Sequence, residues 1–162
     1  MIQNEKRHGG VSRIIALFMA IMLTFVVVTF GLASCGDGES DSEGNVTVVV
    51  AVGDDVRRYE IDLANIEDGT SAVALLDYLE AEGELDYEMS GTFLTKVGHL
   101  EQNADAGVYV GVWTSVEQDY DVSGYFGDVE YDGMTLVASG FGIMEMHYTD
   151  GCTIYFGEMI YG

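Results

Sequence analysis

The sequence predicts a small α+β domain in which an antiparallel or mixed β-sheet packs against one amphipathic helix. Four observations carry this prediction. β-branched and aromatic residues alternate with polar residues over much of the chain after residue 44. Helical spacing of apolar residues occurs in one segment there, and glycine-containing turn dipeptides separate several of the alternating segments. The chain has no proline, so no strand interior is interrupted.

The alternating segments predict the strands. Two opening strands are expected over residues 45–52 and 56–63, joined as a hairpin through Gly53-Asp54-Asp55. Further short strands are expected at residues 86–90, 92–97, 108–115, 129–131, 134–138, 145–148 and 152–160. Asp132-Gly133 and Asp150-Gly151 are dipeptides that fit two-residue hairpin turns.

Residues 71–82 carry the helical pattern. Apolar side chains recur there at helical spacing, at Ala72, Leu75, Leu76 and Leu79. The preceding stretch, Asp68-Gly69-Thr70-Ser71, offers an N-cap, and Gly83 offers a stop. The sequence therefore predicts one helix with a single apolar face.

The first 35 residues have the features of an export signal. Lys6, Arg7 and Arg13 precede a charge-free apolar run over residues 14–30. A run of this length can also span a bilayer as a plain signal anchor. The stretch that follows, Leu32-Ala33-Ser34-Cys35, resembles the lipobox of bacterial lipoproteins. That resemblance implies that Cys35 receives a diacylglyceryl group and becomes the first residue of the mature chain.

This interpretation divides the chain into three parts. We expect a lipoprotein signal peptide over residues 1–34, a lipid-anchored, acidic, flexible linker over 35–45, and one α+β domain over 46–162. The mature chain would have 162 − 34 = 128 residues, enough for one domain with a core. Two acyl chains hold a protein firmly on a bilayer, whereas one holds it marginally. The expected location is the extracytoplasmic face of the cell membrane.

The charge of the mature chain restricts its partners. Export would remove Glu5 alone of the 28 acidic residues and would leave Arg57, Arg58 and Lys96, so the formal charge is about 3 − 27 = −24. Such a surface repels nucleic acid and anionic headgroups and favours a neutral or cationic partner. Strong acidity also serves simply to keep an exported protein soluble.

Several segments, in their order along residues 46–161, resemble one known family. After the two opening strands come GTSAVALLDYLEAEG, GTFLTKVGHL, the tryptophan-bearing VYVGVWTS and the closing HYTDGCTIYF. Together they resemble the transcobalamin C-terminal-domain-like family of exported bacterial modules, found on Gram-positive cell surfaces. The resemblance implies a small α+β module. It also implies a possible corrinoid ligand, because the related domain of vertebrate cobalamin carriers closes over one face of a corrinoid.

Aromatic residues and glycines gather in the second half of the chain. Glycines allow a backbone to approach a flat ligand closely, and aromatic rings stack on one. We therefore expect a small planar ligand, such as a corrinoid like cobalamin or a sugar, to bind at Trp113, Tyr120, Tyr125, Phe126 and Phe141. In the alternative interpretation these aromatic residues form core, and the chain is a surface adhesion or protein-interaction module with no small-molecule ligand.

Residues 119–130, DYDVSGYFGDVE, match the spacing of a calcium loop. An EF-hand also needs flanking helices, and the hairpin expected over residues 129–136 would hold Glu130 in a strand. We therefore expect no EF-hand, although a weaker calcium site in this loop stays open. His99 and His147 have no companion at zinc-ligand spacing, so we expect loop or surface histidines. No metal site is predicted.

The sequence also lacks the signs of an enzyme. It contains no G-x-S-x-G motif, and Cys152 lies in an acidic chain that disfavours a thiolate. Carboxylates are numerous, but no pair of them is singled out by its spacing. We expect no catalytic residue and no cofactor, and the lipid on Cys35 as the link to the membrane.

Substitution of Cys35→Ser tests the lipobox. A hydroxyl does not replace the thiol as the lipid acceptor, so the variant should lose all incorporation of a fatty-acid analogue and should be released or left unprocessed. Labelling of whole cells followed by electrophoresis measures this. A wild-type chain of mature size without label would contradict the prediction.

Overall fold

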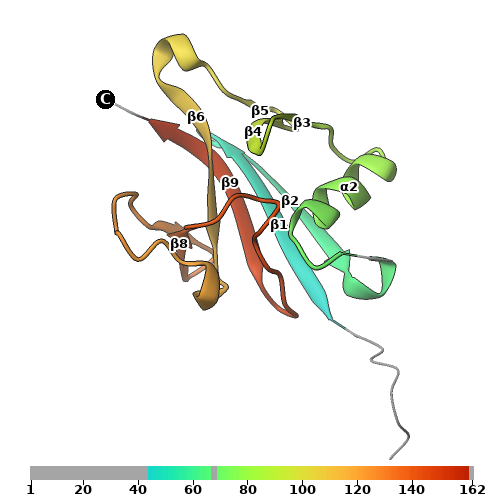
Figure 1. Ribbon diagram of the computed structural model, residues 1–162. Coiled ribbons are helices and arrows are strands. Elements are labelled where there is room, and N and C mark those ends of the chain that lie inside the picture. The colour runs from blue at the N-terminus through green and yellow to red at the C-terminus, as the bar shows by residue number, and fades with distance from the viewer. Residues whose placement is uncertain (1–43, 67–68, 161–162) are drawn as a thin grey trace, which may run out of the picture. The chain divides into compact units, whose positions relative to one another are not determined.

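The computed structural model describes residues 44–66 and 69–160. The expected signal peptide, Cys35 and nearly all of the expected linker lie outside the described residues. The described part is mostly β-structure with one α-helix (Figure 1), which is the α+β class that the sequence predicts. Among these residues, no helix is both long and apolar enough to cross a membrane.

The main sheet has six strands in the order β2-β1-β9-β6-β8-β7. These are β1 (Asn45–Val52), β2 (Asp55–Asp62), β6 (Val108–Thr114), β7 (Val129–Tyr131), β8 (Met134–Ala138) and β9 (Thr153–Ile160). β1 and β9 pair in parallel and the other neighbours pair antiparallel, so the sheet is mixed. A smaller antiparallel sheet contains β3 (Tyr87–Ser90), β4 (Phe93–Val97) and β5 (Leu100–Glu101).

An ion pair shows that the main sheet is strongly curled. In a flat sheet the two edge strands would lie about 24 Å apart, at about 4.8 Å per strand spacing. Yet Arg58 Nη1 on edge strand β2 lies 3.8 Å from Asp132 Oδ2 in the turn before β8, at the opposite edge. The sheet is therefore curled, so that the β7–β8 turn comes within reach of the Arg58 side chain.

The turns follow their residues. Asp132 and Gly133 have φ angles of 49° and 75°, the left-handed pair that a type I′ hairpin turn needs, and they join β7 to β8. The hairpin expected over residues 129–136 is thus confirmed. Asp150-Gly151 does not connect two strands. It forms a turn in which the Cys152 N–H donates to Thr149 O at 3.1 Å, just before β9 begins.

The helix, α2 (Val73–Ala81), begins two residues later and ends one residue earlier than the expected range of residues 71–82. Its N-cap is Ala72, which has no capping side chain, so the N-cap expected at residues 68–71 is wrong. Instead, the Ala72 N–H donates to Met146 O at 2.8 Å. At the other end Gly83 has φ 73°, and the N–H of Glu84 donates to Leu79 O, which is a Schellman motif.

Three short 3₁₀ helices were not predicted: η1 (Leu63–Asn65), η2 (Ala104–Ala106) and η3 (Glu117–Asp119). Each is a single turn that connects or ends a strand. The sequence offers at most one capping side chain to mark each of these turns. Asp62 caps η1 and Asn103 caps η2, and η3 has no capping side chain.

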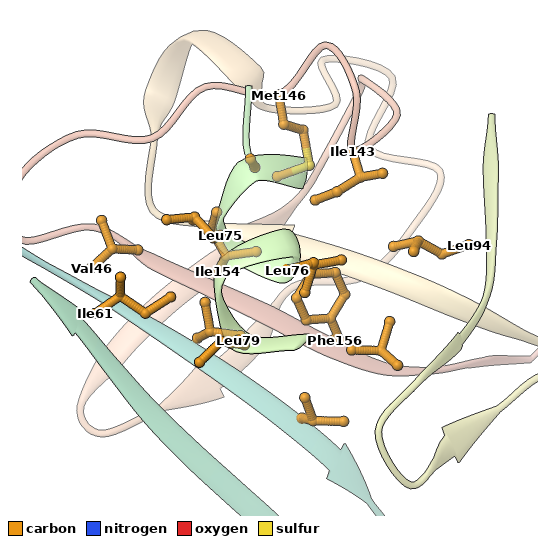
Figure 2. Close-up of a cluster of buried hydrophobic side chains, with 14 of the residues drawn as sticks. Val46, Ile61, Leu75, Leu76, Leu79, Leu94, Ile143, Met146, Ile154 and Phe156 are labelled. Atoms are coloured by element: carbon orange, nitrogen blue, oxygen red, sulfur yellow. The ribbon is translucent and has the colours of Figure 1, made fainter. Parts of the chain in front are cut away.

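The larger core lies between the main sheet, α2 and the small sheet. All four apolar positions expected on one helix face are buried. Figure 2 shows Leu75, Leu76 and Leu79 of the helix close to Ile154 and Phe156 of β9. Leu94 of β4, Ile143 and Met146 complete this side, and Val46 and Ile61 of the hairpin complete the other. Helix and sheet therefore meet through side chains at the expected periodicities.

The strand expected over residues 145–148 is wrong, because other groups already bond the backbone there. Met146 N–H donates to Gly142 O, and Met146 O accepts from the helix N-cap. His147 N–H donates to Asp119 Oδ2 at 2.6 Å, and its ring Nδ1 lies 2.8 Å from Asp119 Oδ1. Asp119 is fully buried. The segment is therefore held by a buried carboxylate and not by a neighbouring strand.

Substitution of Asp119→Ala should lower the free energy of unfolding by about 2–4 kcal/mol, because it removes two hydrogen bonds to a charged acceptor. Denaturant unfolding monitored by circular dichroism measures the loss. Asp121→Ala is the matched control, since that exposed carboxylate bonds only within its own loop, and its effect should be much smaller. Equal effects of the two substitutions would show that Asp119 does not hold the 142–148 segment.

Candidate functional site

A hollow of about 420 Å³ lies where β6, the end of β9 and the segment before β7 meet. Three aromatic residues, two carboxylates and several apolar groups surround it. The lining residues are Trp113, Tyr125, Phe126, Gly127, Asp128, Val129, Glu158, Met159 and Ile160. Three of the five aromatic residues expected at the ligand site, Trp113, Tyr125 and Phe126, thus come together here.

Trp113 forms the buried inner wall of the hollow. Its cross-strand neighbour is Tyr155, and their ring centroids lie 6.0 Å apart at an interplanar angle of 82°. Gly111 and Gly157 lie opposite each other on the same two strands, two residues away from Trp113 and Tyr155. A Cβ atom on Gly111 would lie 2.5 Å from the Trp113 ring, so the indole occupies the space that the glycine leaves. Trp113 is 6% exposed. With Leu136 and Ala138 it forms a second hydrophobic cluster, separate from the larger core.

Hydrogen bonds hold residues 121–127, the segment that lies next to Trp113. The indole Nε1–H donates to Gly127 O at 2.7 Å. Upstream, Asp121 accepts hydrogen bonds from the backbone and hydroxyl of Ser123, and these bonds lower the pKa of Asp121. The Ser123 hydroxyl oxygen in turn accepts from Tyr125 N–H at 3.2 Å. The loop that carries the outer aromatic wall is therefore preorganised by its own hydrogen bonds.

Tyr125 and Phe126 form the outer wall. Their rings pack edge to face, with centroids 5.0 Å apart at 85°. Tyr125 is 74% exposed and offers its ring to solvent. The exposed carboxylates of Asp128 and Glu158 also border the hollow. Aromatic faces beside carboxylates suit a ligand with a flat apolar face and a hydroxylated or cationic edge.

The other two expected residues lie outside this hollow. The Tyr120 hydroxyl donates to Ser115 O at 3.2 Å, and its backbone forms a bridge with Ser139. Phe141 is partly exposed, and its N–H donates to the Ser139 hydroxyl at 3.1 Å. Both residues therefore belong to the connection between β6, β8 and the 142–148 segment.

Sequence reasoning missed Asp128, Glu158 and Met159 as lining residues. In the sequence each resembles many other acidic or apolar residues. The register of β6 against β9, which places Tyr109 opposite Met159 and Trp113 opposite Tyr155, brings the end of β9 to this wall. No local signal in the sequence specifies that register.

The carboxylates of the calcium-loop pattern point to different partners. Asp119 is bonded to His147, Asp121 to Ser123, and Glu130 accepts from the Thr135 hydroxyl at 2.6 Å within the β7–β8 hairpin. Within residues 44–66 and 69–160, no group of three His, Cys, Asp or Glu side chains is arranged to hold a metal ion.

Cys152 is a buried thiol beside the 142–148 segment. Burial raises its pKa, and the nearby negative charge of Asp119 acts in the same direction, although a hydrogen bond from Thr149 N–H acts against them. The thiolate is therefore disfavoured at neutral pH, which is the opposite of what an activated nucleophile needs.

The comparisons with known proteins leave the ligand open. No protein-family model matches the chain, and no curated protein matches it. In structure it is similar to a crystal structure described as a "putative metal binding protein" from Ruminococcus gnavus, with a TM-score of 0.49 and 16% sequence identity. The match covers 74% of this chain and 100% of that one.

Substitution of Gly111→Ala should destabilise the domain by about 1–3 kcal/mol, because the new methyl group displaces the Trp113 ring. Gly127→Ala is the control, since a Cβ atom there meets nothing within 4 Å. Thermal unfolding and the position of the tryptophan fluorescence maximum measure both effects. A Gly111→Ala variant as stable as Gly127→Ala would show that the indole does not lie over Gly111.

Proposed function

We propose that this protein is a lipid-anchored, extracytoplasmic binding protein whose domain captures a small planar ligand in the hollow beside Trp113, and that it is not an enzyme. One observation carries the proposal. Trp113, Tyr125 and Phe126 converge on a single concave surface, although they come from a strand and a separate loop.

The size and charge of the hollow narrow the ligand. Its volume of about 420 Å³ falls near the lower end of the range of roughly 300–1,000 Å³ that is usual for small-molecule sites. A single sugar-sized ring, or the edge of a larger planar molecule such as a corrinoid, matches that volume. Asp128 and Glu158 at the rim, together with the strongly acidic chain, favour a neutral or weakly cationic ligand.

The anchor completes the proposal. The stretch LASC after a charge-free apolar run supports lipidation of Cys35, and the Gly-, Ser-, Asp- and Glu-rich residues 36–44 would separate the domain from the bilayer. A protein held in this way captures its ligand outside the cytoplasmic membrane. The buried thiol of Cys152 and the occupied carboxylate of Asp119 support binding over catalysis, because neither group is free to react.

A titration of the full-length chain in detergent tests the binding site. Cyanocobalamin and a neutral oligosaccharide are the probes, and equilibrium dialysis, with Trp113 fluorescence as a second signal, measures binding. Tyr125→Ala should weaken binding of the successful probe at least tenfold, because an exposed ring that stacks on the ligand is lost. The fold should survive, since that side chain is exposed.

Val122→Ala is the matched control, because Val122 is 99% exposed and does not line the hollow. It should bind as the wild type does. Absence of binding by both probes, or equal affinities of Tyr125→Ala and wild type, would contradict the proposed site. In that case the chain is better explained as a surface adhesion or protein-interaction module.

A further inference from the structure

Strand β2 is a long, open edge of the main sheet. It pairs with β1 over all eight of its residues and is the terminal strand in the sheet order (Figure 1). The Leu63 N–H donates to Gly44 O, so in β2 the odd-numbered residues are the ones whose backbone groups bond to β1. In an antiparallel pair these alternate with residues whose N–H and C=O point away from the partner. Residues 56, 58, 60 and 62 therefore offer their backbone groups to the open side.

This edge is also where the cations of an acidic chain concentrate. Residues 35–162 contain three Arg or Lys residues, and two of them, Arg57 and Arg58, lie on β2. Both side chains are exposed. A second copy of a chain with so many carboxylates must overcome repulsion, and this repulsion is weakest where both copies present their cations. β2 also carries Asp55, Glu60 and Asp62, so its charges nearly balance, and a second copy approaches it at a lower electrostatic cost than it approaches a surface of carboxylates alone.

The charges along β2 are complementary to themselves in one register. A two-fold axis brings two β2 edges together antiparallel, and the outward-bonding residues must then face one another. With the axis at Tyr59, Arg58 of each copy lies opposite Glu60 of the other. With the axis at Arg58 or at Glu60, the same residue meets itself and like charges are opposed, which destabilises a strand pair.

The neighbouring charges agree with this register. Arg58 Nη2 lies 2.6 Å from Glu60 Oε1 of its own strand, on one face of the sheet. A second copy would extend this pair to four alternating charges across the axis. Asp132, 3.8 Å from Arg58, lies on the same side and adds a further acceptor. Networks of this kind contribute more than isolated surface pairs.

From the open backbone edge and this charge pattern, we propose that two copies of the chain associate through their β2 strands, with Tyr59 at the two-fold axis and Arg58 facing Glu60 of the other copy. The two six-stranded sheets then form one continuous sheet. The association is independent of the hollow, because β2 does not line it.

Cysteine cross-linking of the full-length chain in bacterial membranes tests the register. In the proposed dimer the two Tyr59 residues form a pair without hydrogen bonds, with Cα atoms about 4.5 Å apart, within the range of a disulfide. Tyr59→Cys should therefore give a covalent dimer rapidly under mild oxidation. Arg57→Cys is the control. In the proposed register, residue 57 of one copy faces residue 61 of the other, so the two residues at position 57 lie about 13 Å apart along the strand.

Non-reducing electrophoresis measures the dimer, with the wild-type chain as the baseline for Cys35 and Cys152. The expected result is at least a tenfold faster cross-link for Tyr59→Cys than for Arg57→Cys. Equal rates in the two variants, or a faster cross-link for Arg58→Cys or Glu60→Cys, would overturn the proposed register.

Charge exchange tests the contact itself. Arg58→Glu and Glu60→Arg should each weaken the dimer at least tenfold in sedimentation of the detergent-solubilised chain, because like charges then face each other. Mixing the two variants should restore a dimer, since one copy then carries two acidic residues at 58 and 60 and the other carries two arginines. The double variant should also dimerise. A monomeric wild-type chain at all concentrations, or a mixture that fails to associate, would overturn the proposal.

Discussion

The structure depends on β9, which lies inside the sheet and uses both of its faces. It pairs in parallel with β1 on one side and antiparallel with β6 on the other. Because successive side chains of a strand point to opposite faces, Ile154 and Phe156 enter the core under the helix, whereas Tyr155 packs against Trp113. One eight-residue strand therefore supports both hydrophobic clusters, and its registers set the position of everything that packs on them.

The second cluster has a further constraint, which is the flat glycine surface beneath the indole. Gly111 and Gly157 are opposite each other, and side chains at these positions would collide with the Trp113 or Tyr155 ring. With the ring lying over this pair, its Nε1–H reaches Gly127 and holds the loop that carries Tyr125 and Phe126. The two glycines thus influence the hollow indirectly, because they set the position of the Trp113 ring. The packing of this ring in turn sets the position of the loop that lines the hollow.

Charge has two separate effects in this molecule. The many exposed carboxylates give the surface a uniform repulsion toward anions, and the rim of the hollow shares this character through Asp128 and Glu158. One carboxylate, Asp119, is instead buried and holds an irregular segment by hydrogen bonds. The difference arises from solvation, because an exposed carboxylate is stabilised by water, whereas a buried one persists only with donors in place.

What the sequence determined by itself is what depends on neighbours along the chain. Alternation gave most of the strands, helical spacing gave α2 with its buried leucines, and Gly83, Asp132 and Gly133 marked a helix end and a hairpin, because φ preferences act locally. Tertiary structure decided the rest. Residues 145–148 became irregular because Asp119, far away in sequence, bonds His147, and a backbone N–H thus found a side chain instead of a strand. Likewise, Trp113, Tyr125 and Phe126 meet at the hollow while Tyr120 and Phe141 do not, because strand register and loop bonding are long-range and no local pattern encodes them.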